Sequence, residues 1–172
     1  AAYHLQTECP ERDYVILEGR QALGGTWDLF RYPGIRSDSD LYTFGYRFKP
    51  WSGKPIATAE AIREYMEEVI EENHLAGHIR YHHRVERARW DSDSALWTLE
   101  VRNSVDGSLR TFTGRFLWMC QGYYRHEKGY TPEWPGMENF KGDIVHPQEW
   151  KEDYDYTGKR VVVIGSGATA AT

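Results

Sequence analysis

The densest group of residues suited to ligand chemistry is the run from Gly24 to Asp38, Gly-Gly-Thr-Trp-Asp-Leu-Phe-Arg-Tyr-Pro-Gly-Ile-Arg-Ser-Asp. Two adjacent glycines at its start allow the backbone to approach a ligand closely, because neither carries a Cβ. A tryptophan and a tyrosine offer flat apolar surface, and an arginine and an aspartate bring opposite charges just beyond a Pro-Gly turn. The run has neither a helical nor a strand period. These features predict a loop that surrounds a ligand.

A second glycine-rich run, of the form GxGxxA, follows the apolar residues of 159–164. The pattern alone is weak evidence. Placed directly after a β-branched strand, however, it predicts a strand–turn–helix unit that holds a pyrophosphate at the helix N-terminus. The residues expected to form this unit are Gly165, Ser166, Gly167, Ala168, Thr169, Ala170 and Ala171.

The acidic residue Glu18 ends a short apolar run and precedes the first loop. In a dinucleotide-binding βαβ unit, an acid at the end of the second strand binds the adenosine ribose, about 20 residues after the glycine fingerprint. Counting back from Glu18 places that fingerprint at or before residue 1. We therefore expect the chain to begin inside the first helix and to end at Thr172 inside a later one, so that it is truncated at both ends. The alternative for Glu18 is an exposed strand end.

The elements that must position these loops can be predicted from hydrophobic periodicity. Buried strands are expected over 13–18, 115–120 and 159–164, and the alternating aromatic residues of 41–51 favour an extended segment with one buried face. Thr58 is expected to cap a helix that runs to about His74. Its apolar stripe is Ile62, Tyr65, Met66, Val69 and Ile70, with glutamates on the solvated face.

Short alternating runs separated by turn signals predict an antiparallel meander. They are 79–83, 85–90, 96–101 and 109–113. The adjacent His82 and His83 do not predict a metal site, because neighbouring strand residues point to opposite faces and no other ligand cluster is near.

The composition of the 172 residues limits the partners. A net charge of −5 without a basic block argues against nucleic acid or an anionic membrane surface. The apolar runs are too short for a transmembrane helix. Cys9 and Cys120 lie far apart and form no CxxC pair, which favours a reducing, cytoplasmic compartment over a zinc site.

The first loop resembles that of flavin-dependent Baeyer–Villiger monooxygenases, whose pattern is Gly-Gly-x-Trp, four residues, Tyr-Pro-Gly, three residues, Asp. The matching residues are Gly24, Gly25, Trp27, Tyr32, Pro33, Gly34 and Asp38. A second run resembles the family's FxGxxxHxxxW fingerprint, and it consists of Phe140, Gly142, His146 and Trp150. The family has Pro or Asp at the next position, where this chain has Lys151. Within the class B flavin-containing monooxygenases, the chain is most similar to the group that includes the thioamide-activating monooxygenase of mycobacteria.

The resemblance implies an α/β fold of the FAD/NAD(P)-binding Rossmann-like type, with two dinucleotide-binding domains and the meander inserted. Residues 1–122 would be a partial FAD-binding domain without its first strand and Gly-rich loop. Residues 123–139 would be a linker, and 140–172 would begin the NADP-binding domain.

The resemblance also assigns roles to residues of this chain. Cofactor binding falls to Glu18, Gly24, Gly25, Thr26, Trp27, Asp28, Leu29, Arg36, Ser37, Asp38, Tyr42, Val85 and the GxGxxA run up to Ala171. Glu18 would bind the FAD ribose, and the backbone of Val85 the adenine. Asp38 would lie near the isoalloxazine, where its carboxylate can hold a catalytic arginine that is absent from this chain. His146 would couple the two domains and the nicotinamide site without transferring protons.

The implied reaction is the NADPH-dependent insertion of one oxygen atom of O2 into ketones, giving esters or lactones, with sulfides as further substrates. Two alternatives stay open. One is a flavin monooxygenase that oxygenates amines and sulfides, although that group usually has Tyr or Phe where Trp150 stands. The other is a non-catalytic fragment of such an enzyme. The preference for NADPH over NADH rests on the resemblance alone.

Overall fold

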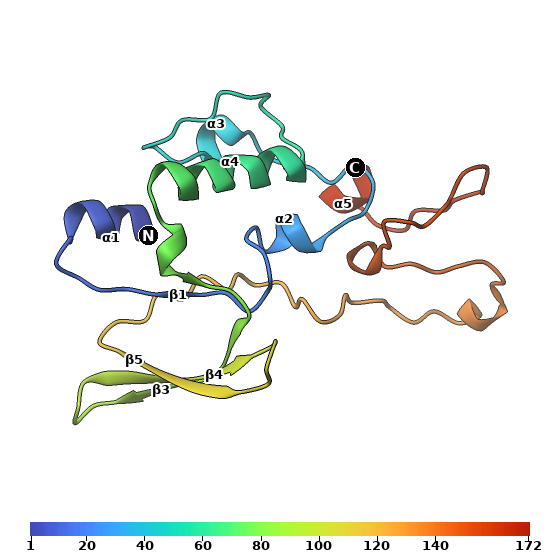
Figure 1. The fold of residues 1–172 in the computed structure, drawn as a ribbon. Helices are drawn as coiled ribbons and strands as arrows, with labels where there is room; N and C mark the ends of the chain where they lie inside the picture. The colour runs from blue at the N-terminus through green and yellow to red at the C-terminus, as the bar shows by residue number, and fades with distance from the viewer. The chain divides into compact units, whose positions relative to one another are not determined.

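The computed structural model describes residues 1–172, which form two compact units (Figure 1). One unit comprises residues 1–25 and 65–122, and the other comprises residues 26–64 and 123–172. The helix α4 (Ala59–Glu72) contributes to both. None of the helices has the length and apolar character needed to cross a membrane.

The first unit holds a short parallel pair of strands, β1 (Ile16–Leu17) and β2 (Ile79–Arg80). The helix α1 (Ala2–Glu8) precedes β1, and the 3-10 helix η1 (Ala76–His78) leads into β2. The Tyr14 ring stacks on the ring of His78 at a centroid distance of 4.1 Å. This contact joins the segment before β1 to the segment before β2.

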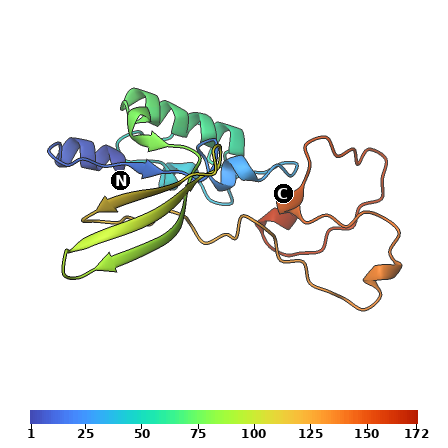
Figure 2. The same cartoon turned by 60° about the horizontal axis from the view of Figure 1, so that its bottom comes forward.

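The rest of the first unit is an antiparallel meander in the order β3 (His83–Asp91), β4 (Leu96–Asn103) and β5 (Leu109–Gly114). Figure 2 shows it as a twisted three-stranded sheet, coloured green to yellow. Its turns form where the sequence predicts them, because Asp91 accepts from the Ser94 amide at 2.8 Å and Gly107 adopts a φ of +70°. The meander is confirmed for the three runs from 85 onward, and Val101 in its central strand is fully buried. The run 79–83 is not part of it, because Ile79 and Arg80 pair in parallel with β1 instead.

The predicted helix over 58–74 is also confirmed. The hydroxyl oxygen of Thr58 accepts from the Ala61 amide at 3.3 Å, and α4 begins at Ala59. Ile62, Tyr65 and Val69 are buried along one face. The glutamates of the opposite face, Glu67, Glu68, Glu71 and Glu72, are exposed. The helix thus has the amphipathic character that its sequence predicts.

The second unit contains, besides the start of α4, four-residue helices and loops. These helices are α2 (Thr26–Leu29), α3 (Leu41–Phe44) and α5 (Ala168–Ala171), together with the 3-10 helices η2 (Met137–Asn139) and η3 (Pro147–Glu149). Loops make up most of this unit, so hydrogen bonds and ion pairs between them set its conformation.

The extended conformation predicted for residues 41–51 is wrong at its start. Asp40 caps α3 instead, since its carboxylate accepts from the Thr43 amide at 2.9 Å and from the Thr43 hydroxyl at 3.1 Å. The side chains of Tyr42 and Phe44 are exposed, and Leu41 is buried. A local cap therefore outweighs the two-residue aromatic alternation.

Three predicted strands differ from the structure. Over 13–18 only Ile16 and Leu17 form a strand, because β2 pairs with just these two residues. Both are half-buried. The segments 115–120 and 159–164 form no strand, and their apolar side chains, such as Trp118 and Val162, are exposed. Neither segment is hydrogen-bonded into a sheet, and an apolar run alone does not supply the partner strand that a ladder needs.

Truncating the buried side chain at the centre of the meander should destabilise it. We expect Val101→Ala to lower the free energy of unfolding by about 1.5 to 3 kcal/mol, because it removes buried apolar surface and leaves a cavity. Urea unfolding, followed through the indole NMR signals of the paired Trp90 and Trp97, measures the change. The matched control is Val105→Ala, whose side chain is 74% exposed and whose effect should stay within about 0.5 kcal/mol. Equal effects of the two substitutions would contradict burial as the cause.

Candidate functional site

The loop that ends in the predicted site residue Asp38 is fixed against the start of α4. The Ser37 amide donates to the Ala57 carbonyl at 2.8 Å, and the Ala57 amide donates to the Ser37 hydroxyl oxygen at 3.1 Å. The Ala59 amide donates to the Ile35 carbonyl at 3.1 Å. Ser37 and Ala57 are both buried, so this short ladder holds the loop in one conformation.

The buried carboxylate of Asp28 is the electrostatic centre of the second unit. Asp28 is 5% exposed, and its Oδ1 lies 3.0 Å from Nη2 of Arg31 and 3.7 Å from Nε of Arg63. A buried carboxylate is stable only when it is paired in this way. The two arginines thereby fix α2, which carries Asp28, against α4, which carries Arg63.

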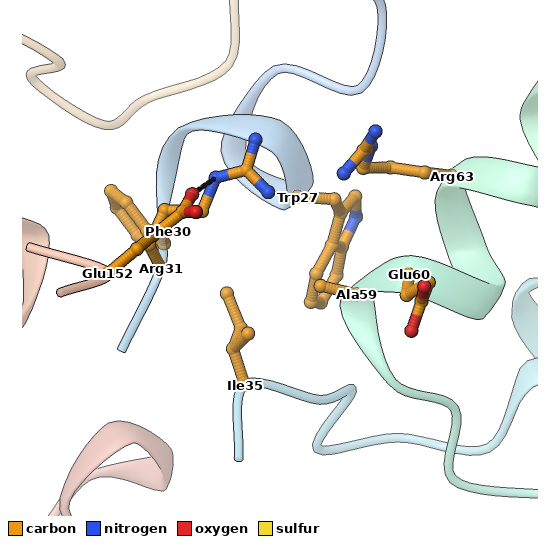
Figure 3. A pocket seen from close by; sticks show the side chains of 8 residues that line it. All are labelled: Trp27, Phe30, Arg31, Ile35, Ala59, Glu60, Arg63 and Glu152. Carbon is orange, nitrogen blue, oxygen red and sulfur yellow. Dashed lines mark ion pairs between the residues drawn. The ribbon is translucent and has the colours of Figure 1, made fainter. Parts of the chain in front are cut away.

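A pocket of about 300 Å³ opens beside this ion-pair network (Figure 3). Its lining combines apolar and charged side chains and consists of Trp27, Phe30, Arg31, Ile35, Ala59, Glu60, Arg63 and Glu152. Figure 3 shows the Trp27 ring beside the start of α4 and the ion pair between Arg31 and Glu152, in which Nε and Oε1 are 3.1 Å apart.

A second pocket, of about 450 Å³, brings two predicted cofactor motifs together. It is lined by Arg36, Ser37, Asp38, Ile56, Ala168, Ala171 and Thr172. The Tyr32 hydroxyl lies 3.5 Å from that of Thr169. Gly34 has a φ of +77°, and a Cβ there would lie 3.1 Å from Cγ2 of Thr172. The close approach of the loop to α5 therefore requires glycine at this position.

The predicted site residue His146 makes a structural contact. Its Nδ1 accepts from the Gln148 amide at 3.1 Å and so caps η3, which places the proton of the neutral ring on Nε2. A Cβ on Gly129 would overlap the imidazole. Gly142 is equally close to a ring, since a Cβ there would lie 2.7 Å from Cζ of Phe140. Both glycines thus leave room for an aromatic side chain.

The segment after His146 is held by an aromatic cluster and a polar one. The ring centroid of Trp150 lies 5.4 Å from that of Tyr154 and 5.5 Å from that of Tyr156. The Tyr154 hydroxyl donates to Oδ2 of Asp143 at 2.7 Å, and Nζ of Lys159 lies 3.5 Å from the same oxygen. This hydrogen bond, and secondly the charge of Lys159, lower the pKa of the Asp143 carboxyl.

Two predicted site residues lie in the first unit. Oε1 of Glu18 accepts from the Arg20 amide at 2.9 Å, and the Glu18 carbonyl accepts from the His83 amide at 2.8 Å. Val85 is 40% exposed and faces Val101 across the β3–β4 ladder. Gly24 and Gly25 end this unit's first segment with φ values of +106° and +50°.

The remaining predicted residues belong to the second unit. Thr26, Trp27, Asp28 and Leu29 form α2. Tyr42 on α3 is 60% exposed, and its hydroxyl donates to the Gly53 carbonyl at 2.9 Å. Gly165 and Ser166 precede Gly167, which is the N-cap of α5, and Ala168, Thr169, Ala170 and Ala171 form that helix.

Sequence reasoning missed Arg31, Arg63, Glu152 and Tyr124. Arg31 carried a local signal, since it follows Asp28 at the three-residue spacing of helical ion pairs. Arg63 and Glu152 carried none, because they reach the network from distant parts of the chain. The Tyr124 ring packs edge-on against Phe30 at 5.7 Å, and a hydrogen bond with Tyr123, followed by burial, raises the pKa of the Tyr124 hydroxyl.

Residues 55–172 match the model of the flavin-binding monooxygenase-like family. The chain belongs to this family. It is 54% identical over 172 residues to the FAD-containing monooxygenase EthA of Mycolicibacterium smegmatis, a match that covers 99% of this chain and 35% of that protein. It is 50% identical to the probable FAD-binding monooxygenase AlmA of Acinetobacter sp, with 99% of this chain and 34% of that protein covered. The chain thus spans about a third of the length of these family members.

Solved structures of flavin-dependent monooxygenases share its fold. A steroid monooxygenase bound to NADP superposes with a TM-score of 0.75 at 31% identity, covering 98% of this chain and 32% of that one. The OTEMO complex with FAD and NADP superposes with a TM-score of 0.74 at 29% identity, again covering 98% and 32%. The predicted family and the predicted fold class are therefore confirmed.

Removing the Ser37 hydroxyl should weaken the ladder that fixes the loop. In Ser37→Ala the buried Ala57 amide loses its acceptor, so we expect the free energy of unfolding to fall by about 1–3 kcal/mol. Exchange of the Ala57 amide hydrogen should accelerate correspondingly. Ser39→Ala is the matched control, because the Ser39 hydroxyl makes only a long contact of 3.5 Å with Asp38. A Ser37→Ala variant as stable as Ser39→Ala would show that this hydroxyl does not fix the loop.

The Asp143 carboxyl should titrate in a way that depends on Tyr154. Because its pKa is lowered in the folded chain, the contact contributes its full stabilisation above the ordinary value of about 3.9, and the contribution is lost as the pH falls through the folded-state pKa. Tyr154→Phe should raise the pKa of Asp143, as measured by NMR of its carboxyl carbon. Tyr156→Phe is the control, since Tyr156 packs on Trp150 without bonding to Asp143. An unmoved titration in Tyr154→Phe would rule out the hydroxyl as the cause.

Proposed function

We propose that this chain is part of an FAD- and NADPH-dependent monooxygenase that inserts one oxygen atom of O2 into ketones and gives esters or lactones. Sulfides are proposed as further substrates. The observation that carries the proposal is the second pocket, where the residues after Tyr32-Pro33-Gly34 meet the GxGxxA helix. Family membership supports it, as does the likeness to the OTEMO complex with FAD and NADP and to a steroid monooxygenase bound to NADP.

The first unit and the adjoining loop offer suitable FAD contacts. Glu18 uses Oε1 for the Arg20 amide, so Oε2 would accept the ribose hydroxyls. The positive φ values of Gly24 and Gly25 turn the backbone sharply, and a Cβ on Gly25 would meet no atom within 4 Å. This open, side-chain-free turn fits a cofactor that lies close to the main chain. The other proposed FAD contacts are α2 from Thr26 to Leu29, Tyr42 and the backbone of Val85.

The second pocket is the proposed NADP site. Arg36, Ser37 and Asp38 would contact the dinucleotide from one side. The run from Gly165 to Ala171 would contact it from the other side, with Gly167 next to the pyrophosphate. Because the ladder to Ala57 holds Ser37, the backbone that carries Arg36 and Asp38 keeps its position beside the pocket.

The protein's proposed part in the reaction is binding, orientation and charge placement. Bound FAD would accept hydride from the nicotinamide and activate O2, so that one oxygen atom enters the substrate and the other leaves as water. The exposed carboxylate of Asp38 would hold an arginine beside the flavin. His146, whose Nδ1 is engaged with the Gln148 amide, would set the shape of the segment between the domains.

We also propose the domain division into a partial FAD-binding domain (1–122), a linker (123–139) and the start of an NADP-binding domain (140–172). The loop that begins at Gly24 then belongs to the FAD-binding domain, and the GxGxxA run belongs to the NADP-binding domain. A cytoplasmic location is proposed from the two free cysteines.

The first experiment is a flavin absorbance spectrum of the chain purified with FAD, beside that of a chimera in which it replaces the matching segment of the M. smegmatis relative. We expect the chimera to retain FAD and to consume NADPH faster with a cyclic ketone than with an amine. A chimera that oxidises sulfides and amines but does not oxidise ketones would favour the amine- and sulfide-oxygenating alternative. A chimera that folds but binds no FAD would refute the proposal.

Substitution of Glu18 tests the proposed ribose contact. A hydrogen bond to a charged group is worth about 1.5–3 kcal/mol, so Glu18→Gln should raise the Kd of the chimera for FAD by about tenfold to a hundredfold. Fluorescence titration with FAD measures it. Glu11→Gln removes an exposed carboxylate of the same segment and should leave the Kd unchanged. If both variants bind FAD equally, Glu18 is an exposed strand end and not a ligand.

A further inference from the structure

We propose that Arg31 is a positioning residue that ties the flavin loop, residues 24–38, to the segment following the FxGxxxHxxxW fingerprint, through Glu152. This contact would hold the nicotinamide and flavin sites in the geometry needed for flavin reduction by NADPH. The inference rests on the proposed function, and it adds a residue pair at positions that neither family pattern specifies.

The guanidinium of Arg31 contacts two carboxylates with two different nitrogens. Nη2 donates to Oδ1 of Asp28 at 3.0 Å, and Nε lies 3.1 Å from Oε1 of Glu152. Asp28 belongs to α2 of the flavin loop, whereas Glu152 is the second residue after Trp150. A single side chain thus links the two motifs that the resemblance assigns to the two cofactors.

Burial of Asp28 makes this link more than an ordinary surface ion pair. The side chain of Glu152 is 71% exposed, and exposed pairs are usually weak because both long side chains must be ordered. Here Asp28, at 5% exposure, already orients the planar guanidinium. Only the side chain of Glu152 then has to be ordered. The planar guanidinium of Arg31, already held by Asp28, presents its Nε–H toward Glu152 in a fixed direction.

The other side-chain contacts of the segment that contains Glu152 lie within residues 143–159, and they include the hydrogen bond from Tyr154 to Asp143. The Trp150 ring packs on Tyr154 and Tyr156, all within the same stretch of chain. Glu152 supplies its ion-pair contact with the flavin loop, at the edge of the first pocket (Figure 3). Loss of the pair should therefore loosen the segment relative to the loop without unfolding either.

The Lys variant of Arg31 separates the two contacts. A lysine has one nitrogen, which can pair with the buried Asp28 but does not reproduce the fork. Arg31→Lys should therefore keep Asp28 paired and lose Glu152. The test set is Glu152→Gln, Arg31→Lys and their double variant. Asp153→Asn serves as the control, because it removes the neighbouring exposed carboxylate.

The first readout uses the 172-residue chain without cofactor. Amide hydrogen exchange should accelerate by about twofold to fivefold over residues 150–156 in Glu152→Gln and in Arg31→Lys. Asp153→Asn should exchange like the wild type. Equal exchange in all four proteins would overturn the proposed link.

The second readout is the rate at which NADPH reduces the flavin, measured by stopped flow in the chimera. Glu152→Gln and Arg31→Lys should each slow reduction by about twofold to fivefold, with unchanged FAD content and unchanged reoxidation by O2. The double variant should be no slower than either single variant, because both changes break the same contact. The role of Arg31 would be overturned if the two single-variant decreases in reduction rate multiplied in the double variant. It would also be overturned if Asp153→Asn slowed reduction as much as Glu152→Gln does.

The two readouts distinguish this inference from the proposed function. A wild-type chimera without FAD refutes the proposed function, and the role of Arg31 in reduction falls with it. A Glu152→Gln chimera that NADPH reduces as fast as the wild-type chimera refutes only the role of Arg31.

Discussion

The buried carboxylate of Asp28 is the constraint on which the second unit depends. An unpaired charge with 5% exposure would be strongly destabilising. Arg31 offsets it with a hydrogen-bonded ion pair at 3.0 Å, and the more distant Arg63, at 3.7 Å, adds a second positive charge. This requirement orients α2 against α4 and turns Arg31 toward Glu152. In the second unit this electrostatic contact acts beside buried apolar side chains such as Phe30 and Leu41, whereas the core of the meander in the first unit consists of apolar side chains such as Val101.

The parts of the fold that the sequence predicts correctly are those with local causes. Thr58 caps α4 through an amide three residues away, and the turns of the meander depend on Asp91 and Gly107, which lie within the turns themselves. The failure at 41–51 has a local cause too. Asp40 binds the Thr43 amide and starts α3, and a prediction from the aromatic alternation alone does not include this cap.

Contacts between distant segments are the part that the sequence does not reveal. Ser37 and Ala57 form a reciprocal pair of hydrogen bonds, and Arg31 meets Glu152, yet no period or motif relates either pair. The strands expected over 115–120 and 159–164 fail for a related reason. Apolar composition indicates that a segment can be buried in a sheet, but a ladder needs a hydrogen-bonded partner strand, and neither segment has one. Resemblance located the candidate site residues, while the structure shows which contacts hold them.

The FxGxxxHxxxW pattern can be explained by packing. The Phe140 ring lies in the space that a side chain at position 142 would occupy. The imidazole of His146 lies against Gly129 in the same way. His146 uses Nδ1 to cap η3, and the ring of Trp150 packs against the rings of Tyr154 and Tyr156. Each residue of the pattern therefore has a conformational task in this loop. In this chain the pattern therefore fixes the local conformation of the segment, and the contact that the structure gives His146 is a cap on the η3 backbone.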